Sequence, residues 1–599
     1  MNRLAWGICL FLVLFVALLA TALQGVDVTD QGYNLTNQVH AVSGVARDAH
    51  PPMTFLTDYV GGWWLLLAGG PSLLWARAGY PLLTALTAVA AYAVLARQFA
   101  PCRVFVAVLV SAFFITIREF RYIHYFSFPA LLLTVELLAI DRMLEAPPET
   151  RSFRIWALLA GFLPVPAVLG RFSLVLFGFA PAVVFGWWLF ARRSTDRLKR
   201  AVPWIGLGLV LSCAVFGALY ASIGYLDTYA EGLRAQLLGM AGAGHVGGAE
   251  TGSATGHGIT GLAKMYLRQY GHVGLYAGGI ALGLFALSLL RDRVGIQAVA
   301  GLLVLLTAAG CAFKFVRFDF ARSAPGLMGA YKPAKLGMAG VFLVAGLFYW
   351  HDPRRSGRLG LLLLLGLFVM VITPLGSNTG LNKSLYGMWI VLPLALLLVG
   401  ELRDRGRGPR LRSMLALRGA VVAALVVFCA FMHYTNTYRD IQNRVVLDTP
   451  LRYRGLRGMY THEARADVLD PALARIDALT EPGDEILCVG HIPLFYYLTE
   501  TRPFLGHVWL SLRTIPAIEE AFDQKVNIDG RLPALFVVAR VDPVSYSWPD
   551  GRAGDGWPGM LRRCELLRRR LVQERGYRLV FENRAFAVYR NPELVGRRP

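Results

Sequence analysis

The sequence predicts a polytopic α-helical membrane protein that carries a C-terminal α/β domain. Two observations predict this class. The 599 residues are 55% hydrophobic with a mean hydropathy of +0.48, and apolar runs of about 20 residues recur through most of the chain. From about residue 434 the sequence is polar and mixed in charge. We therefore divide the chain into a transmembrane domain, residues 1–433, and a soluble domain, residues 434–599.

The apolar runs define the expected transmembrane helices, about thirteen in number. The first run is longer than the apolar region of a cleaved signal peptide, so we expect it to remain as a helix. The expected helices are residues 4–24, 76–96, 103–118, 126–140, 155–169, 173–190, 203–223, 273–290, 295–313, 336–350, 359–374, 385–400 and 419–433.

One further apolar segment, residues 54–70, is short and contains Trp63 and Trp64. Tryptophan is favoured at membrane–water interfaces, so we expect an interfacial helix within a first outer loop that runs from about Gln24 to Trp75. A second long outer loop is expected from Gly224 to His272. Its glycine-rich part suits either a linker or a lid.

Lysine and arginine cluster in every second loop, and this clustering explains the net charge of +21 better than nucleic-acid binding does. The positive-inside rule places these loops in the cytoplasm. We therefore expect a bacterial cytoplasmic (inner) membrane protein with its N-terminus inside and its C-terminal domain outside. The basic loops lie at residues 97–103, 142–154, 192–200, 291–293, 354–358 and 403–418.

The soluble domain has the pattern of a small α/β fold. Two apolar runs predict buried strands, two segments predict helices, and the last two apolar segments predict a terminal strand pair. In the same order, these are residues 485–490 and 535–539, 473–479 and 560–574, and 577–581 and 585–589.

Acidic residues gather in the outer segments next to the membrane, namely Asp27, Asp30, Asp58 and Glu119. A carboxylate at this place can act as a general base on an acceptor hydroxyl, or hold a divalent cation such as Mg²⁺ or Mn²⁺ against a diphosphate. The structural alternative is a helix cap, because Asp30 precedes a helix-like stretch and Asp is a good N-cap residue.

Several outer segments also carry cations, which the positive-inside rule disfavours there. Arginine and lysine recognise phosphate oxygens, so we expect a lipid-linked phosphate or pyrophosphate as the ligand. The alternative is pairing with lipid headgroups or with acids in the same loops. The candidate substrate-binding residues are Asp58, Arg118, Arg121, Arg171, Lys314, Arg317, Arg322, Lys332, Lys335, Asn378 and Lys383.

The sequence Asp30-Gln-Gly-Tyr33 directly follows the first helix. It resembles the GT-C superfamily of integral membrane glycosyltransferases, and most of all the branch of protein mannosyltransferases, aminoarabinose transferases and arabinofuranosyltransferases. The helix number and the trailing outer domain are also similar. The branch often has Asp-Glu-Gly-Tyr at this place, so Gln31 departs from the pattern and argues against a metal site built from paired acids.

The resemblance implies roles for individual residues. Asp30 matches the acid of the motif and is the expected catalytic base, with Asp27 as an additional acid and Glu119 as the acid of a second outer loop. Tyr33 joins the substrate-binding residues. The implied reaction transfers a sugar, with inversion, from a polyprenyl-phosphate donor to a cell-envelope glycan, lipid or protein on the outer face of the membrane.

Two other functions compete with this interpretation. An O-antigen ligase or polymerase also uses polyprenyl-linked sugars, but its distinguishing element is a large loop between late helices. A lipid-linked sugar transporter or flippase is expected to show matched halves and charged residues inside its spans. The spans expected here are nearly free of charge, and a soluble C-terminal domain is not a transporter feature.

Overall fold

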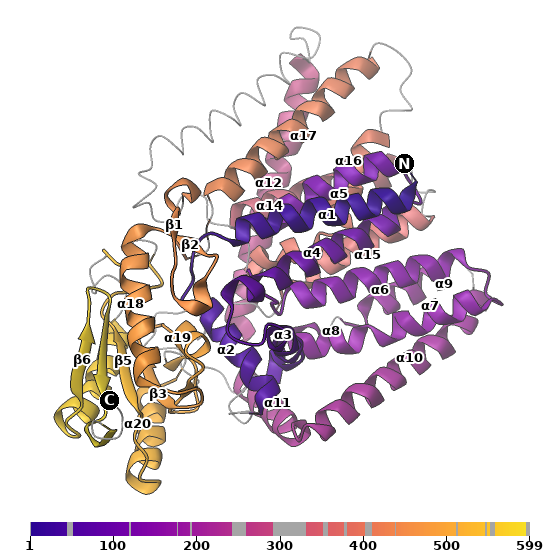
Figure 1. The fold of residues 1–599 in the computed structure, drawn as a ribbon. Coiled ribbons are helices and arrows are strands. Elements are labelled where there is room, and N and C mark those ends of the chain that lie inside the picture. Colours follow the sequence, from indigo (N-terminus) through magenta and orange to yellow (C-terminus); the bar gives the residue numbers. More distant parts are fainter. Residues whose placement is uncertain are drawn as a thin grey trace.

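The computed structural model shows a bundle of helices with a β-sheet at its C-terminal side (Figure 1). The residues that the structure describes are 2–44, 52–118, 121–175, 178–191, 195–241, 259–290, 331–351, 357–375, 380–401, 410–435, 437, 439–441, 443–510, 513–545, 548–550 and 558–594.

The long helices of the bundle follow the apolar runs of the sequence. They are α1 (Arg3–Ala22), α4 (Leu73–Leu95), α5 (Pro101–Ile115), α6 (Ser127–Glu145), α7 (Arg151–Phe162), α8 (Pro164–Gly170), α9 (Ala180–Ala191), α10 (Thr195–Ser222), α12 (Ile259–Leu290), α14 (Tyr331–His351), α15 (Arg358–Ile372), α16 (Val391–Glu401) and α17 (Arg410–Thr435).

Helix α1 shows why these helices belong in a membrane. One face buries Leu10, Leu14 and Leu18 against the bundle, whereas Leu12 and Val16 on the other face are 53% and 62% exposed. A helix with apolar side chains all round is buried in protein or in lipid, so the outer face of α1 faces lipid.

Among the described residues, four helical stretches are long and apolar enough to cross a membrane, or five if one bent pair is a single span. They are Arg3–Ala22, Leu73–Leu95, Arg151–Gly170 and Asp196–Ser222, with the bent pair Gly380–Gly387 and Val391–Val399. The expected number of about thirteen therefore stays a prediction, and the expected helix at residues 295–313 lies outside the described residues.

Two expected elements differ from the structure. The segment expected as one helix, residues 385–400, is a 3-10 helix η7 (Gly380–Gly387) followed by α16 at an angle of 70°. The loop expected from Gly224 to His272 instead contains α11 (Leu226–Ala241) and the first half of α12. A third difference lies inside α6, where Glu136 is fully buried, so the expected spans are not as free of charge as the sequence analysis assumes.

The bundle has two ends with different partners. The basic end holds the N-terminus and brings together four of the predicted basic loops, through Arg97, Arg142, Arg200 and Arg358. The first-loop end lies opposite and holds residues 23–30, where the C-terminal sheet also lies (Figure 1). The segments found at each end agree with the predicted order of loops. The side of the membrane on which each end lies stays a prediction.

At the first-loop end, two helices precede α4. Helix α2 (Asp30–Ser43) packs on α3 (Phe55–Leu66), and a Cβ at Gly62 would lie 2.2 Å from the Gln38 carbonyl oxygen, so only glycine allows this approach. Twelve residues of α-helix are about 18 Å long, too short to cross a bilayer core of about 30 Å. Trp63 is 53% exposed, as suits the interfacial helix predicted for this segment.

The C-terminal region contains a five-stranded mixed sheet in the order β4-β3-β5-β7-β6. Strand β3 is parallel to β4 and β5, while β7 is antiparallel to β5 and β6. The strands are β3 (Glu485–Val489), β4 (Arg502–Pro503), β5 (Leu535–Ala539), β6 (Arg578–Glu582) and β7 (Phe586–Arg590), and a separate pair is β1 (Thr449–Pro450) with β2 (Tyr460–Thr461). The four longer strands, β3, β5, β6 and β7, match the four predicted strands in position and in chain order.

Helices surround this sheet and connect it to the bundle. They are α18 (Glu463–Leu479), α19 (Leu494–Leu498), α20 (Ile515–Asp523) and α21 (Pro558–Arg568). Helix α19 packs on α2, and a Cβ at Gly32 would lie 2.0 Å from the Leu494 backbone nitrogen. One core cluster includes residues from both regions, so packing is continuous across the boundary predicted after residue 433.

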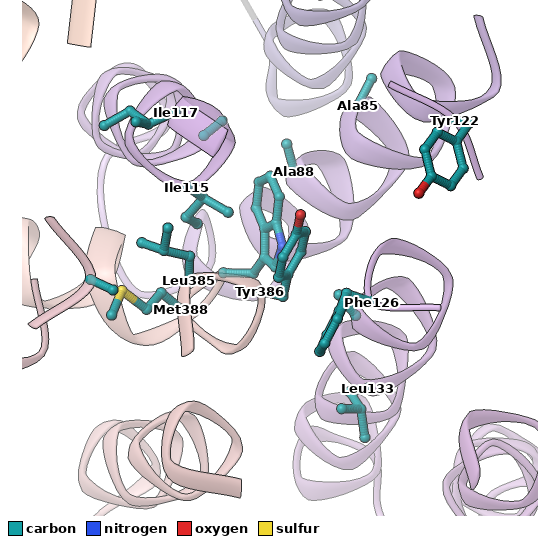
Figure 2. Packing of buried hydrophobic residues seen from close by; sticks show 14 of the residues in the cluster. Ala85, Ala88, Ile115, Ile117, Tyr122, Phe126, Leu133, Leu385, Tyr386 and Met388 are labelled. Carbon is teal, nitrogen blue, oxygen red and sulfur yellow. The ribbon is translucent and has the colours of Figure 1, made fainter. Parts of the chain in front are cut away.

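The centre of the bundle is apolar. Ala85 and Ala88 of α4, Phe126 before α6 and Tyr386 of η7 lie around one shared core (Figure 2). The Phe126 and Tyr386 rings are stacked with centroids 5.3 Å apart. This contact fixes the start of α6 against the turn between η7 and α16, next to the residues of the candidate site.

Candidate functional site

The first loop is shaped by Asp27. Its carboxylate accepts hydrogen bonds from the Thr29 N–H (2.9 Å), the Thr29 hydroxyl (2.6 Å) and the Gln31 N–H (2.8 Å). These bonds satisfy donors at the start of α2, where the first N–H groups have no partner within the helix. Asp27, not Asp30, therefore does the capping work at this helix.

Burial raises the pKa of Asp27, and the nearby charge of Asp30 adds to the rise. Asp27 is 2% exposed. Its oxygens are committed to the turn, so its geometry is that of a positioning residue. The catalytic role expected for Asp27 stays a prediction that these bonds do not support.

Buried arginines hold the backbone of the first loop. Arg77 of α4 donates to the Ala22 carbonyl (2.8 Å) and to the Gln31 side-chain oxygen (2.8 Å). Arg121 donates to the Gln24 carbonyl. The structure thus places Arg121, expected as a phosphate ligand, on the backbone of the first loop.

The segment after α17 completes the loop. Asp440 accepts from the Val26 N–H (2.7 Å) and the Thr461 hydroxyl (2.7 Å), and it pairs with Arg465 at 3.0 Å with both side chains fully buried. Leu494 N–H donates to the Val28 carbonyl (3.1 Å). The first loop is therefore held from the C-terminal region as well as from α4.

Asp30 lies at the first residue of α2 with its side chain 23% exposed, so it remains accessible. Its Oδ2 accepts a hydrogen bond from the Arg439 guanidinium at 3.0 Å. Arg439 has a left-handed backbone with φ of 57°, which is uncommon for a residue other than glycine. Its carbonyl accepts from Arg465 at 2.8 Å, which holds this conformation.

A second carboxylate, that of Asp58, acts on the same two tyrosines as Asp30. Asp58 of α3 is 2% exposed, accepts from the Thr54 hydroxyl at 2.8 Å, and burial raises its pKa to about 7. The charges of Asp58 and Asp30 both act on the phenols of Tyr33 and Tyr125. Burial raises the pKa of Tyr33 more than these charges do, and burial raises the pKa of Tyr125 to about 12. Both phenols therefore stay protonated and can donate hydrogen bonds.

Two cations, Arg171 and Lys383, lie on one aromatic ring, and we call them the cation pair. The Arg171 guanidinium carbon lies 3.9 Å and the Lys383 Nζ 4.4 Å from the Phe126 ring centroid. Cations are attracted to the face of an aromatic ring. Arg171 also donates to the carbonyls of Thr373 (2.5 Å) and Leu375 (3.2 Å), and burial lowers its pKa to about 10.

His124 and Tyr125 join the two sides of the site. Burial lowers the pKa of His124 well below its usual value, and the charges of Lys383 and Arg171 lower it further, so His124 is neutral. Tyr125 lies within electrostatic reach of Arg171, Asp30 and Asp58 together. The site therefore combines acids from α2 and α3 with a cation that follows α8 and a cation in η7.

Of the expected site residues, the structure brings together Asp30, Tyr33, Asp58, Arg171 and Lys383. Asp27 lies within the first loop, and its carboxylate is bonded to the turn. Lys335 instead contacts the His272 ring nitrogen at 3.1 Å. The other candidates lie outside what the structure describes, as whole residues or as side chains; these are Glu119, Lys314, Arg317, Arg322 and Asn378, and the side chains of Arg118 and Lys332.

Three charged residues of the site region were missed by sequence reasoning, namely Arg439, Asp440 and Arg465. The available signal was the adjacent Arg439-Asp440 directly after the last apolar run. It is weak, because a pair of opposite charges in a polar segment is common on any solvated surface.

The described acids do not form a metal-binding group. No cluster of three or more His, Cys, Asp or Glu side chains that could hold a metal ion occurs among the described residues. Asp27 is saturated by its three hydrogen bonds, and Asp30 is paired with Arg439. The expected Mg²⁺ or Mn²⁺ therefore has no fitting set of ligands in this part of the chain.

No family model and no curated protein matches the chain. Solved structures do match. ArnT from Cupriavidus metallidurans in the apo state has 12% identity and a TM-score of 0.44, with 98% of this chain and 97% of that chain covered. The same protein bound to undecaprenyl phosphate has 13% identity and a TM-score of 0.43, with 98% of each chain covered.

The oligosaccharyltransferase AglB from Archaeoglobus fulgidus, in complex with an inhibitory peptide and a dolichol-phosphate, has 12% identity and a TM-score of 0.42. The match covers 89% of this chain and 69% of AglB. At identities of 12–13% and TM-scores of 0.42–0.44, the matches carry no argument about the chemistry of the site.

Proposed function

We propose that this protein is a membrane glycosyltransferase that takes a sugar from a polyprenyl-phosphate donor and passes it to an acceptor at the first-loop end of the bundle. The observation that carries the proposal is the cation pair. Arg171 and Lys383 lie on one aromatic ring, and the hydrogen-bond partners of Arg171 are neutral carbonyl oxygens. Their positive charge suits a phosphate, which guanidinium and ammonium groups bind through charge-assisted hydrogen bonds.

The proposed donor follows from the position of this site. Arg171 comes directly after α8, which ends an apolar stretch that can cross the membrane, so its guanidinium lies at the edge of the bilayer. A phosphate bound there is at the depth of a lipid headgroup. A lipid-linked phosphate therefore fits this place better than a soluble nucleotide sugar does.

In the proposed reaction, Asp30 accepts the proton of an acceptor hydroxyl, whose oxygen forms a bond to the sugar C1. The bond between C1 and the donor phosphate oxygen breaks, and its electron pair stays on the phosphate. Arg171 and Lys383 stabilise this negative charge as it develops. Attack from the side opposite to the phosphate gives inversion, and Arg439 orients the Asp30 carboxylate throughout.

Asp58 has a different proposed task. With a pKa of about 7 it exchanges its proton in the working range of most cells, and its buried position suits hydrogen bonding to a sugar hydroxyl. Tyr33 and Tyr125, on which the charge of Asp58 acts, add phenol donors. These residues form the proposed sugar-binding part of the site, between the acceptor base and the cation pair.

The function is tested by mass spectrometry of polyprenyl-phosphate sugars and cell-envelope glycans in a strain that lacks the protein. We expect one lipid-linked sugar to accumulate and one sugar to be missing from a glycan, lipid or protein. Wild-type protein and the control Asp448→Asn, an exposed acid in the same outer region, should restore the product. Asp30→Asn should not, although its amount in the membrane is normal.

Restoration by Asp30→Asn would contradict the role of Asp30. Transport is distinguished by a second measurement, in which the purified protein is placed in liposomes with a fluorescent polyprenyl phosphate and no acceptor. Movement of the carrier across the bilayer without any acceptor would favour a flippase, for which the buried Glu136 in α6 would be the relevant charge.

A further inference from the structure

A pocket lies at the basic end of the bundle, far from the proposed active site. Its volume is about 400 Å³, and its lining includes Arg97 after α4, Arg142 and Glu145 near the end of α6, and Ser152 and Trp156 of α7. This volume is within the range of small-molecule sites, about 300–1,000 Å³. The positive-inside rule explains why arginines are present here, but it does not explain why they converge on one pocket.

The charges around the pocket do not balance. Arg97, Arg142 and Arg358 all contact the Glu145 carboxylate, Arg142 at 3.4 Å and Arg358 at 2.6 Å. Arg358 also binds Asp141 with two hydrogen bonds of 2.6 and 2.5 Å. Three guanidinium groups thus face two carboxylates, and one positive charge remains. A partly buried excess charge favours an anion as its partner.

The N-terminus of α7 also favours an anion in this pocket. Thr150 caps this helix by accepting from the Phe153 N–H at 3.2 Å, and Ser152 is its second residue. The N-terminus of a helix carries about half a positive charge and presents N–H groups, so it favours anions. Helix α7 has twelve residues, and its first turn borders the pocket that the arginines line.

The remaining wall of the pocket is apolar. Leu138 of α6 and Trp156, one turn further along α7, complete the lining. Tryptophan is favoured where lipid headgroups meet the hydrocarbon layer. An anion site with an apolar wall at the end of the helices suits an amphiphilic ligand, and it does not suit a fully hydrated ion.

We propose that this pocket binds the phosphate headgroup of an anionic phospholipid in the leaflet at the basic end. Arg97 and Arg142 contact the phosphate, the first turn of α7 and Ser152 donate to its oxygens, and Leu138 and Trp156 contact the glycerol and the start of the acyl chains. Basic pockets between transmembrane helices bind such headgroups on the cytoplasmic side of membranes. The site is independent of the proposed glycosyltransferase reaction.

The proposal is tested by native mass spectrometry of the full-length protein after removal of bound lipid and titration with phosphatidylglycerol or phosphatidylcholine. We expect phosphatidylglycerol to bind about tenfold more tightly or better. The double variant Arg97→Gln/Arg142→Gln should lose about 10- to 30-fold of this affinity, since each basic residue contributes about 1 kcal/mol to anionic lipid binding. The control Arg103→Gln, an exposed cation at the same end, should not change it.

A second variant covers the case in which the double variant fails to fold. Ser152 is exposed, and Ser152→Glu places a negative charge in the first turn of α7, where it favours the helix but repels a phosphate. We expect an unchanged melting temperature and about tenfold weaker phosphatidylglycerol binding.

Two results would overturn the proposal. One is an unchanged preference for phosphatidylglycerol in both variants. The other is displacement of phosphatidylglycerol by millimolar inorganic phosphate, which would assign the site to a free anion.

Discussion

Two arginines, one at each end of the helix bundle, are held by different kinds of partner. At the basic end, Arg358 is held by the Asp141 and Glu145 carboxylates in direct ion pairs. At the first-loop end, Arg171 is held by two carbonyl oxygens and the face of Phe126. Both guanidinium groups are well fixed, but only the first one has its charge compensated by carboxylates.

From this difference we propose that Arg171 binds a ligand, whereas Arg358 stabilises the fold. A carboxylate partner both holds the side chain and cancels its charge. Carbonyl oxygens and an aromatic ring hold the side chain and leave most of its charge for a ligand. Arg171 is thus oriented before any ligand arrives, which is the arrangement that costs least when a phosphate binds.

The largest expected effect is at the basic end. Arg358→Ala leaves Asp141, whose side chain is fully buried, without its bidentate partner. Removing one partner of a buried pair costs about 3–5 kcal/mol. We expect a clear fall in the melting temperature of the purified protein in detergent, while the exposed control Arg103→Ala should stay within about 0.5 kcal/mol of wild type. Equal melting temperatures of Arg358→Ala and wild type would contradict the stabilising role of the Arg358–Asp141 pair.

The matching substitution at the other end should destabilise less and affect binding more. Arg171→Ala removes hydrogen bonds to the neutral carbonyls of Thr373 and Leu375, at a cost of about 1–3 kcal/mol. Undecaprenyl phosphate binding should weaken about 10- to 100-fold, since a hydrogen bond to a charged group contributes about 1.5–3 kcal/mol. Titration of the protein in nanodiscs measures this, with the exposed Arg452→Ala as the control. Normal binding of undecaprenyl phosphate by Arg171→Ala would contradict the assignment of Arg171 as a phosphate ligand.

The packing of the C-terminal region on the first-loop end gives a third prediction. Gly32→Ala places a Cβ 2.0 Å from the Leu494 backbone nitrogen, so α2 and α19 must separate. Overpacking of this kind costs about 1–3 kcal/mol. We expect faster proteolysis of the C-terminal region. Gly70→Ala is the matched control, because its Cβ would meet open space. Identical digestion of the two variants would mean that the C-terminal region is not anchored at this contact.

The last prediction concerns the pH dependence of stability. Burial raises the pKa of Asp58 from 3.8 to about 7 in the folded protein. The folded state therefore binds a proton more tightly than the unfolded state, so stability falls as the pH rises from about 4 to about 7 and is level above that. Asp58→Asn removes this loss, and its melting temperature relative to wild type should rise between pH 5 and pH 8. A constant difference across this range would contradict the buried, protonated Asp58.

Much of this arrangement could be predicted from the sequence, because its signals are local. Apolar runs and the spacing of basic loops predict which segments meet at each end, and the contacts of Arg97, Arg142, Arg200 and Arg358 agree. The C-terminal strands were found from apolar runs between turn residues. The place directly after the first helix indicated Asp27 and Asp30 as candidate acids, and their catalytic roles stay predictions.

Other features could not be predicted, because they depend on contacts between distant residues. The apolar run at residues 385–400 continues through the bend between η7 and α16, so hydropathy does not reveal the break. Arg439 and Asp30 are 409 positions apart. Arg171 and Lys383 were each predicted as cations in outer loops, but only the fold places both on Phe126.

The capping role of Asp27 shows a further limit. The sequence predicts Asp30 as a possible N-cap and both acids as catalytic candidates. The hydrogen bonds separate them, since Asp27 is bonded three times within the turn and Asp30 faces Arg439. Two acids three positions apart have the same local pattern, and only the backbone path tells which one turns inward.

The most direct test of the account is a cryo-EM map of the protein incubated with undecaprenyl phosphate. We predict phosphate density between Arg171 and Lys383, with nitrogens of both side chains at charge-assisted hydrogen-bond distances of about 2.7–2.9 Å from the phosphate oxygens. The prenyl chain should leave toward the bilayer. Phosphate density at another site, with the cation pair unchanged on Phe126, would contradict the central claim.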